Sequence, residues 1–410
     1  MGKFTALDDP LVDQTVETHL QRIVAALRAR MQPQAIILRG SFGRGEGSVL
    51  VQDGKLRFLS DYEIDVATFS PLYRSLFREL SRQLTAEFDV ETSLRWVRPD
   101  HMRTNRVGPV PMGPLPITIA LYESRYGSQT LYGQDLIHSG PTVDPCQIRL
   151  ESGIWLVLNR MAESLHYMPG AGAQHDELEV IHWVNKTVLA CAESLLLLWG
   201  QYHFSYRERG RRFAALAHQR LVFMPDETRM LTDLVARATE FKLRPRRDLY
   251  PHTVQEAWLE VVPICDRVFR HLVEQVLGFS VDDYAGFPEQ FLQHTSPASG
   301  SLSPLHLVTL KLLDLYRYLR SRRLPRGLLL PYGVPRVVYA VVPLMFTGWA
   351  GDPPLGGTEY LEERLGGTLS QVRRWLNVIC SLEPSVSDPR KEWDALRKQV
   401  FWAWKNFCHG

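Results

Sequence analysis

Two carboxylates, Asp61 and Glu63, stand at alternate positions of one apolar segment and follow a glycine-rich turn that begins at Gly40-Ser41. Side chains two residues apart on an extended strand point to the same face, so both carboxylates are expected to project together. The backbone N–H groups of a glycine-rich turn can approach an anion closely. Two hard oxygen ligands beside a phosphate cradle predict a site for Mg²⁺ and a nucleoside triphosphate.

This segment, residues 39–66, resembles the motif of the nucleotidyltransferase superfamily, which includes DNA polymerase β and the kanamycin nucleotidyltransferases. The family motif is an apolar residue, Gly-Ser or Gly-Gly, a spacer, and then two acids that alternate with apolar residues. Gly-Ser at 40–41 and Asp-Tyr-Glu-Ile at 61–64 match it. The spacer is longer than is usual in the family. We attribute the extra length to a hairpin at 49–58 with an Asp-Gly turn, which lengthens the gap in sequence without separating the two parts in space.

The resemblance implies a role for each matching residue. Asp61 and Glu63 would hold Mg²⁺, with two ions expected at the site. The residues of the turn would hold the β- and γ-phosphates of a nucleoside triphosphate, and they are Gly40, Ser41, Gly43, Arg44 and Gly45. Asp65 shares the face of the two acids, but it lies beyond the motif and is expected to support the metal ligands.

A third carboxylate completes the family's metal site, on a strand that follows a helix. Leucines with helical spacing predict a helix at 71–87, and the next segment, 88–97, is predicted to be the strand. Two acids share one face of that strand. Asp89, between two apolar residues, fits the family pattern slightly better and is our choice as metal ligand, while Glu91 remains the alternative catalytic residue.

The rest of the chain predicts an α+β N-terminal nucleotidyltransferase domain, a mixed sheet with flanking helices, followed by an all-α region. A helix at 10–31 begins the first domain and a short strand is expected at 117–122. Strand patterns nearly vanish after residue 140. We therefore divide the chain into a catalytic domain at 1–140, a helical domain covering the nucleotide at 141–295 and a second helical subdomain at 296–410.

The later helices are predicted from apolar periodicity. They lie at 154–168, 177–200, 229–241, 253–277, 305–322, 334–346, 358–382 and 389–408. The segment 177–206 looks like the helix that flanks the nucleotide in aminoglycoside-type members of the family. There a lysine reaches the triphosphate, and Lys186 is the matching residue; a solvent-facing lysine is the alternative. Tyr202 and Tyr206 could stack on a base, although a place in the core is the simpler expectation.

Composition sets outer limits. The chain has 410 residues, a formal net charge of +2 and five dispersed cysteines without a CxxC pair, which argues against a disulfide framework or a zinc site and suits the cytoplasm. The N-terminal segment lacks the apolar core of a signal peptide. The most apolar long run, 327–351, contains an arginine and prolines, so we expect buried core and no membrane partner.

The predicted function is Mg²⁺-dependent transfer of a nucleoside monophosphate from a nucleoside triphosphate to a hydroxyl of a small-molecule or protein acceptor. Arginine clusters at 207–212, 242–247 and 317–326 leave open a transferase acting on RNA, although such clusters are commonly solvated helix ends. A non-catalytic nucleotide-sensing or interaction protein on the same scaffold is the alternative from another class. The fold does not choose between acceptors.

Overall fold

The structure is a computed structural model of the chain. It describes residues 2–52, 54–70, 73–104, 117–169, 175–250, 253–295, 333–348, 366–380, 382 and 385–408. These residues form two compact units. Unit 1 contains Met1–Ser152 and Leu196–Leu249, and unit 2 contains Gly153–Leu195 and Tyr250–Gly410. The predicted fold class is confirmed: a mixed α/β region comes first, and no strand occurs among the described residues after Gly133.

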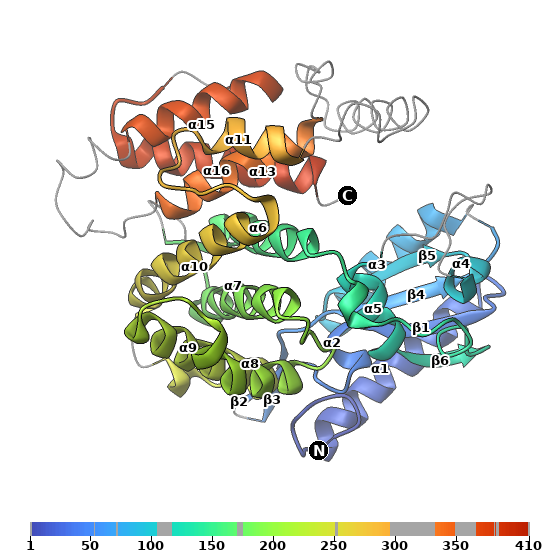
Figure 1. The fold of residues 1–410 in the computed structure, drawn as a ribbon. Coiled ribbons are helices and arrows are strands. Elements are labelled where there is room, and N and C mark those ends of the chain that lie inside the picture. Colours follow the sequence, from blue (N-terminus) through green and yellow to red (C-terminus); the bar gives the residue numbers. More distant parts are fainter. Residues whose placement is uncertain are drawn as a thin grey trace. The chain divides into compact units, whose positions relative to one another are not determined.

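A four-stranded sheet in the order β5–β4–β1–β6 is the centre of unit 1 (Figure 1). Its strands are β1 (Ala35–Arg39), β4 (Tyr62–Ala67), β5 (Thr92–Val97) and β6 (Gln129–Gly133). β1 pairs antiparallel with β4 and β6, whereas β4 and β5 run parallel, so the sheet is mixed. The predicted hairpin is confirmed, because β2 (Val49–Gln52) and β3 (Lys55–Phe58) form a separate antiparallel pair between β1 and β4 in sequence.

One face of the sheet is apolar and lies under helices α1 (Pro10–Arg28) and α3 (Arg74–Phe88). α1 begins where the sequence predicts it: Asp9 caps the helix by accepting a hydrogen bond from the Leu11 N–H, and Pro10 occupies the first turn. The inward-facing residues come from alternate strand positions and from one stripe of each helix. They include Val16, Leu20, Ile23, Ile36, Leu38, Tyr62, Ile64, Val66, Leu80 and Leu84.

The opposite face is divided between an apolar end and a polar end. Ala35, Ile37 and Ala67 form a small core with Leu136 and Ile137. At the other end, Arg39 is paired with Glu63 across β1 and β4. Because strand residues alternate between faces, the carboxylates of β4 and the side chains of Ile37 and Ala67 share this face.

The segment predicted as a strand at 117–122 is instead part of helix α5 (Ile119–Tyr126), so this prediction is wrong. Thr118 caps the helix, its side chain accepting a hydrogen bond from the Leu121 N–H. A short apolar run is compatible with either a strand or a helix, and here the capping residue favours the helix. The remaining short helices of this part are α2 (Gly40–Gly43), α4 (Pro99–Thr104) and a 3₁₀ turn at Pro145–Gln147.

Unit 1 includes a helical hairpin from later in the chain. Helices α8 (Tyr206–Arg220) and α9 (Pro225–Leu243) pack against one another, and a 3₁₀ turn at Arg247–Leu249 follows. The two units therefore do not follow the predicted order of three consecutive domains, because residues 196–249 return to the N-terminal unit. The predicted boundary at 295/296 lies at the edge of a range that the structure does not describe.

Unit 2 is helical throughout its described residues. Its helices are α10 (Val254–Leu277), α11 (Phe287–Thr295), α13 (Val334–Thr347), α15 (Gly366–Ile379) and α16 (Pro389–Phe407), with most of α6 (Glu151–Tyr167) and α7 (Glu177–Leu198). α13 packs against α10, α11, α15 and α16 (Figure 1). It is buried on all sides, as expected for the apolar run in which it lies. The helix predicted at 305–322 falls outside the described residues.

One described helix, α7, is long and apolar enough to cross a membrane by length and composition. Of its most apolar window, 89% is buried inside the protein. A core helix of a soluble protein meets the same criteria, so α7 is weak evidence for a membrane span.

Candidate metal and nucleotide site

The glycine-rich turn lies directly against one of the two predicted metal ligands. β1 ends at Arg39, which is paired with Glu63 on β4, and α2 begins at the next residue, Gly40. Gly40 has φ +65°, and a Cβ added there would lie 2.9 Å from Glu63 Cδ. The backbone conformation therefore favours glycine at this position, and a side chain here would displace the Glu63 carboxyl. The turn and the acidic strand, separate in sequence, form one site in space.

Asp61 and Glu63 are half-buried and act on one another electrostatically. Burial, and next the charge of Asp61, raise the pKa of the Glu63 carboxyl, while the charge of Arg39 lowers it. Neither carboxylate makes a hydrogen bond or ion pair with another residue in the described parts of the chain. Two carboxylates that are drawn partly out of water, near one another and without a hydrogen-bond or ion-pair partner among the described residues, favour a cation.

The pair fits Mg²⁺ bound together with phosphates. Proteins commonly hold Mg²⁺ through one or two carboxylates, with substrate phosphates and water as the other ligands. Asp61 and Glu63 supply two carboxylates. Among the described residues, no group of three or more His, Cys, Asp or Glu side chains could hold a metal ion.

The strand prediction for the segment of the third carboxylate is wrong at the start, because the strand begins at Thr92 and not at residue 88. α3 continues to Phe88, and Asp89 adopts the left-handed conformation, φ 54°, that ends the helix. Glu91 lies in the connection before β5 begins at Thr92. Asp89 and Glu91 are both exposed. The turn that ends the helix includes Asp89, so this acid lies outside the sheet. Glu91 adjoins the sheet, because its carbonyl oxygen accepts a hydrogen bond of 2.8 Å from the N–H of Tyr62, the residue after Asp61. A role for Glu91 as the third carboxylate stays a prediction.

The register between β4 and β5 decides what stands beside the acids instead. Ser93 is the partner of Glu63, and Arg95 is the partner of Asp65. Arg95 Nε and Nη2 donate hydrogen bonds of 2.8 Å each to the two oxygens of Asp65. Arg39 Nη1 lies 3.5 Å from Asp65 Oδ1. Asp65 therefore binds arginines, and sequence analysis missed Arg95 because only the strand register reveals its partner.

The remaining residues of the turn have mainly structural contacts. A Cβ on the buried Gly43 would lie 2.7 Å from the carbonyl oxygens of both Leu38 and Gly127, so this glycine permits close packing of three backbone segments. Gly45 follows α2 with φ +74°. Ser41 is half-exposed beside Gly40 and remains a candidate for contacting a phosphate.

Arg44, predicted to bind phosphate, lies in a buried network. Its side chain is 4% exposed and lies 3.2 Å from Glu123. Glu123 also accepts hydrogen bonds from Tyr202 Oη, at 2.7 Å, and from Arg209 Nη1, at 2.9 Å. Burial raises the pKa of the Glu123 carboxyl, but the charges of Arg44 and Arg209 and the hydrogen bond from Tyr202 together lower it to about 2.

A second set of contacts joins the same turn to α8. Glu46 accepts hydrogen bonds from Ser205 Oγ, at 2.7 Å, and from the Tyr206 N–H, at 2.8 Å, and so caps the N-terminus of α8. Ser48 Oγ donates a hydrogen bond of 2.5 Å to the carbonyl oxygen of Lys242 on α9, and the buried Lys242 donates one of 3.0 Å to Ser60 Oγ. Tyr202 is fully buried, which confirms its expected place in the core. The turn between β1 and β2 is therefore anchored to α5, α8 and α9.

Lys186 belongs to the other unit, on α7. Its Nζ lies 4.2 Å from the centre of the Trp183 ring, and the side chain is half-buried. A role for Lys186 in binding the triphosphate stays a prediction.

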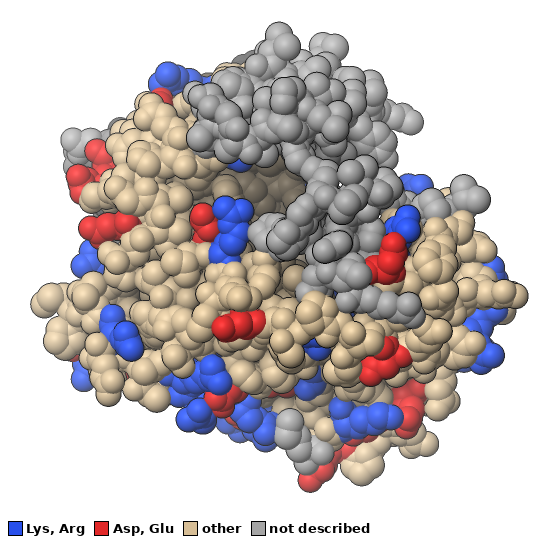
Figure 2. Space-filling model, turned by 45° about the vertical axis from the view of Figure 1, so that its right-hand side comes forward, with Lys and Arg blue, Asp and Glu red and all other residues tan. Residues whose placement is uncertain are grey.

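Two of the three arginine clusters lie in described residues, and several of their members have carboxylate partners nearby. Arg211 and Arg212 each lie 2.8 Å from Glu208, and Arg244 lies 3.4 Å from Glu240. On the face shown in Figure 2, basic and acidic side chains lie close to one another over the described surface. Local pairing of this kind favours solvated helix surfaces over a binding site for a polyanion. The cluster at 317–326 lies outside the described residues.

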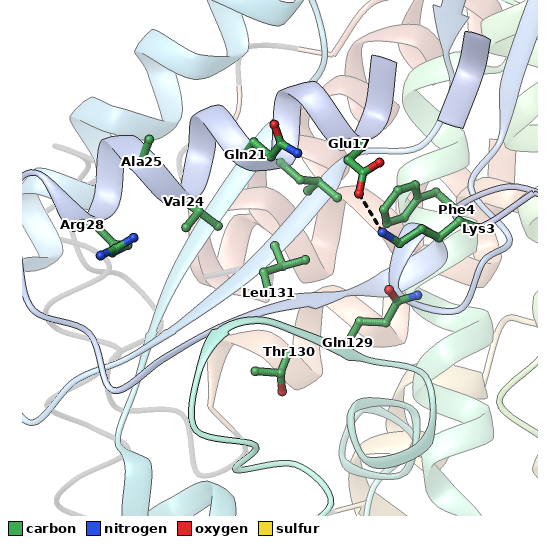
Figure 3. Close-up of a pocket in the computed structure, with 11 residues that line it drawn as sticks. Lys3, Phe4, Glu17, Gln21, Val24, Ala25, Arg28, Gln129, Thr130 and Leu131 are labelled. Atoms are coloured by element: carbon green, nitrogen blue, oxygen red, sulfur yellow. Dashed lines mark hydrogen bonds and ion pairs between the residues drawn. The ribbon is translucent and has the colours of Figure 1, made fainter. Parts of the chain in front are cut away.

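A groove of about 400 Å³ lies elsewhere in unit 1, between α1 and β6 (Figure 3). Its floor is apolar and includes Val24 and Leu131. Arg28 stands at one end, and the ion pair between Lys3 and Glu17 stands at the other. Because α1 covers the face of the sheet opposite Glu63, this groove is separate from the carboxylate site.

No protein-family model, curated protein or solved structure matches the chain.

Proposed function

We propose that this protein is a Mg²⁺-dependent nucleotidyltransferase, which moves a nucleoside monophosphate from a nucleoside triphosphate to a hydroxyl of a small-molecule or protein acceptor. The observation that supports this most is the contact of Gly40 with the Glu63 carboxylate, with Asp61 two residues away, just before β4 begins. This contact joins a turn suited to phosphate with two oxygen ligands that have no hydrogen-bond or ion-pair partner among the described residues.

The proposed reaction is a displacement at the α-phosphorus. The acceptor hydroxyl oxygen forms a bond to this phosphorus, the bond to the bridging oxygen breaks, pyrophosphate leaves, and the hydroxyl proton passes to solvent. When bound, Mg²⁺ would neutralise charge on the phosphate oxygens and lower the pKa of the attacking hydroxyl. Asp61 and Glu63 would hold it. The Ser41 hydroxyl and the N–H groups at the start of the turn would orient the phosphates, since the N–H groups of Arg44, Gly45 and Glu46 donate to carbonyl oxygens of the turn itself.

The direct experiment is incubation of the purified protein with each α-labelled nucleoside triphosphate, Mg²⁺ and a cell lysate, followed by identification of the labelled species. We expect one labelled small molecule or protein, and release of pyrophosphate in equal amount. Label that appears equally with the Asp61→Asn variant would contradict the proposal, because that label would not depend on the site.

A second candidate function is nucleotide sensing without transfer. It is favoured by the place of Asp89 at the end of α3, outside the sheet, and by the finding that no group of three or more His, Cys, Asp or Glu side chains among the described residues could hold a metal ion. A sensor would bind a nucleoside triphosphate in a Mg²⁺-dependent manner and would return it intact. Chromatography of the nucleotide after prolonged incubation with protein and lysate separates the two functions.

A further inference from the structure

A guanidinium group stands beside the carboxylate site, on the strand where the sequence predicts a third acid. Parallel pairing of β4 and β5 places Ser93 next to Glu63 and Arg95 next to Asp65. Both are exposed residues of the edge strand β5, on the face that carries Glu63. A guanidinium group therefore neighbours Asp65 on this side of the sheet.

Arg95 is held in place through one edge of its guanidinium. Nε and Nη2 bind the two oxygens of Asp65, at 2.8 Å each, and the Asp65 side chain is only 2% exposed. Paired hydrogen bonds of this kind fix the plane of the guanidinium as well as its position. Arg39 Nη1 lies 3.5 Å from the same carboxylate, so two positive charges share one negative charge.

The other edge of the Arg95 guanidinium is open. An arginine has five N–H donors, and Asp65 uses two of them. Nη1 makes no hydrogen bond to any other described residue, and the Arg95 side chain is 55% exposed. A planar fork of donors held by a buried carboxylate is preorganised for a second oxyanion, because little side-chain entropy remains to be lost on binding.

We propose that Arg95, positioned by Asp65, contacts a phosphate group of the nucleotide bound at Asp61 and Glu63. The inference rests on the proposed function for the identity of the ligand. Asp65 is then a positioning residue for Arg95. Strand β5, where the sequence predicts a metal ligand, would contribute to phosphate recognition. An arginine neutralises phosphate charge without a further metal ion.

The test is calorimetric titration of the full chain with two probes, ATP and inorganic tripolyphosphate, each with and without Mg²⁺. Arg95→Gln should raise the Kd of both probes about ten- to a hundredfold, as expected for loss of a charge-assisted hydrogen-bonded pair. Arg95→Lys should give an intermediate Kd, because the charge persists and the fork is lost. Asp65→Asn alone should weaken binding of both probes. The double variant Asp65→Asn, Arg95→Gln should bind about as weakly as Arg95→Gln alone.

The matched control is Arg82→Gln, which removes an exposed arginine that pairs with Glu79 on α3. We expect no change in either Kd. Circular dichroism and melting temperature establish that each variant is folded. If Asp65→Asn does not fold, the Kd of Arg95→Lys still tests whether the fork of donors on Arg95 matters for binding. A folded Arg95→Gln protein with wild-type Kd values for both probes would overturn the inference, as would a wild-type protein that binds neither probe.

The result also separates this inference from the proposed function. If Asp61→Asn loses Mg²⁺-dependent ATP binding and Arg95→Gln does not, the metal site stands and the role of Arg95 is refuted. If tripolyphosphate binding without Mg²⁺ depends on Arg95 while no nucleotide is ever transferred, the phosphate site stands and the transferase proposal fails.

Discussion

Gly40 and Glu63 lie so close that a side chain at position 40 would overlap the Glu63 carboxyl. The Glu63 carboxyl occupies the space where a Cβ would be, and the Gly40 backbone has φ +65°. The contact connects the end of β1 with the middle of β4, so the glycine-rich turn and the acidic strand form one structural unit. It also supplies a direct way to disturb the site without removing a charge.

Gly40→Ala should reduce nucleotide affinity at least tenfold, because the Glu63 carboxylate or the turn must move. A residue with a side chain in the left-handed conformation also costs about 1–2 kcal/mol of stability. Gly54→Ala is the control, since Gly54 has φ +72° with no atom within 4 Å of an added Cβ. Both variants should lose stability in urea unfolding, and only Gly40→Ala should lose affinity. Equal nucleotide affinities for the two variants would show that the contact between Gly40 and Glu63 does not contribute to nucleotide binding.

Asp89→Asn should leave Mg²⁺-dependent nucleotide binding unchanged. Asp89 is exposed, follows the last residue of α3 and has φ 54°, a conformation that asparagine also tolerates. The variant therefore tests whether Asp89 is a metal ligand, without disturbing the end of the helix. A large loss of Mg²⁺-dependent affinity in this variant would return Asp89 to the metal site.

The differences between the predicted and observed site have a physical pattern. Local signals identified α1, the hairpin and β4 correctly, because capping residues, an Asp-Gly turn and strand alternation act over a few residues. Asp89 was misplaced because a helix end in the left-handed conformation leaves no apolar periodicity. The pairing of Arg95 with Asp65 depends on the register of two strands, and the network around Glu123 joins residues up to 86 positions apart. No local pattern contains such contacts.

Glu123→Gln should destabilise the protein at neutral pH and flatten its acid response. The folded-state pKa of Glu123 is about 2, below the ordinary value of 4.5, so ionised Glu123 stabilises the fold fully above about pH 4.5. That contribution is lost as pH falls from 4.5 towards 2. Breaking a buried ion pair typically costs about 3–5 kcal/mol, and exposure of 23% of this side chain reduces the cost.

The measurement for this prediction is urea unfolding at pH 7 and at pH 3. Wild type should lose more stability than Glu123→Gln between these values. The control is Glu87→Gln, which removes an exposed ion pair with Arg22 and should cost less than about 1 kcal/mol. An unchanged pH dependence in Glu123→Gln would show that the Arg44–Glu123–Arg209 network does not hold the turn in place.

Lys186→Ala should weaken nucleotide binding about ten- to a hundredfold if Lys186 reaches the triphosphate, as the family resemblance implies. Lys186→Arg should restore part of the affinity, because the charge persists while the geometry changes. The competing expectation is a lysine with a structural role, which includes its contact with the Trp183 ring. In that case titration of ATP with Mg²⁺ gives wild-type affinity in both variants, and the assignments of Gly40, Asp61 and Glu63 are unaffected.

The most direct test of the central claim is calorimetric titration of nucleoside triphosphates into wild type, Asp61→Asn and Glu63→Gln, with Mg²⁺ and with EDTA. Both substitutions keep the size of the side chain and remove its charge. We predict that Mg²⁺ strengthens binding at least tenfold in wild type and has no effect in either variant, while circular dichroism shows an intact fold. Mg²⁺-dependent binding of wild-type strength in both folded variants would contradict the assignment of Asp61 and Glu63 as the metal ligands.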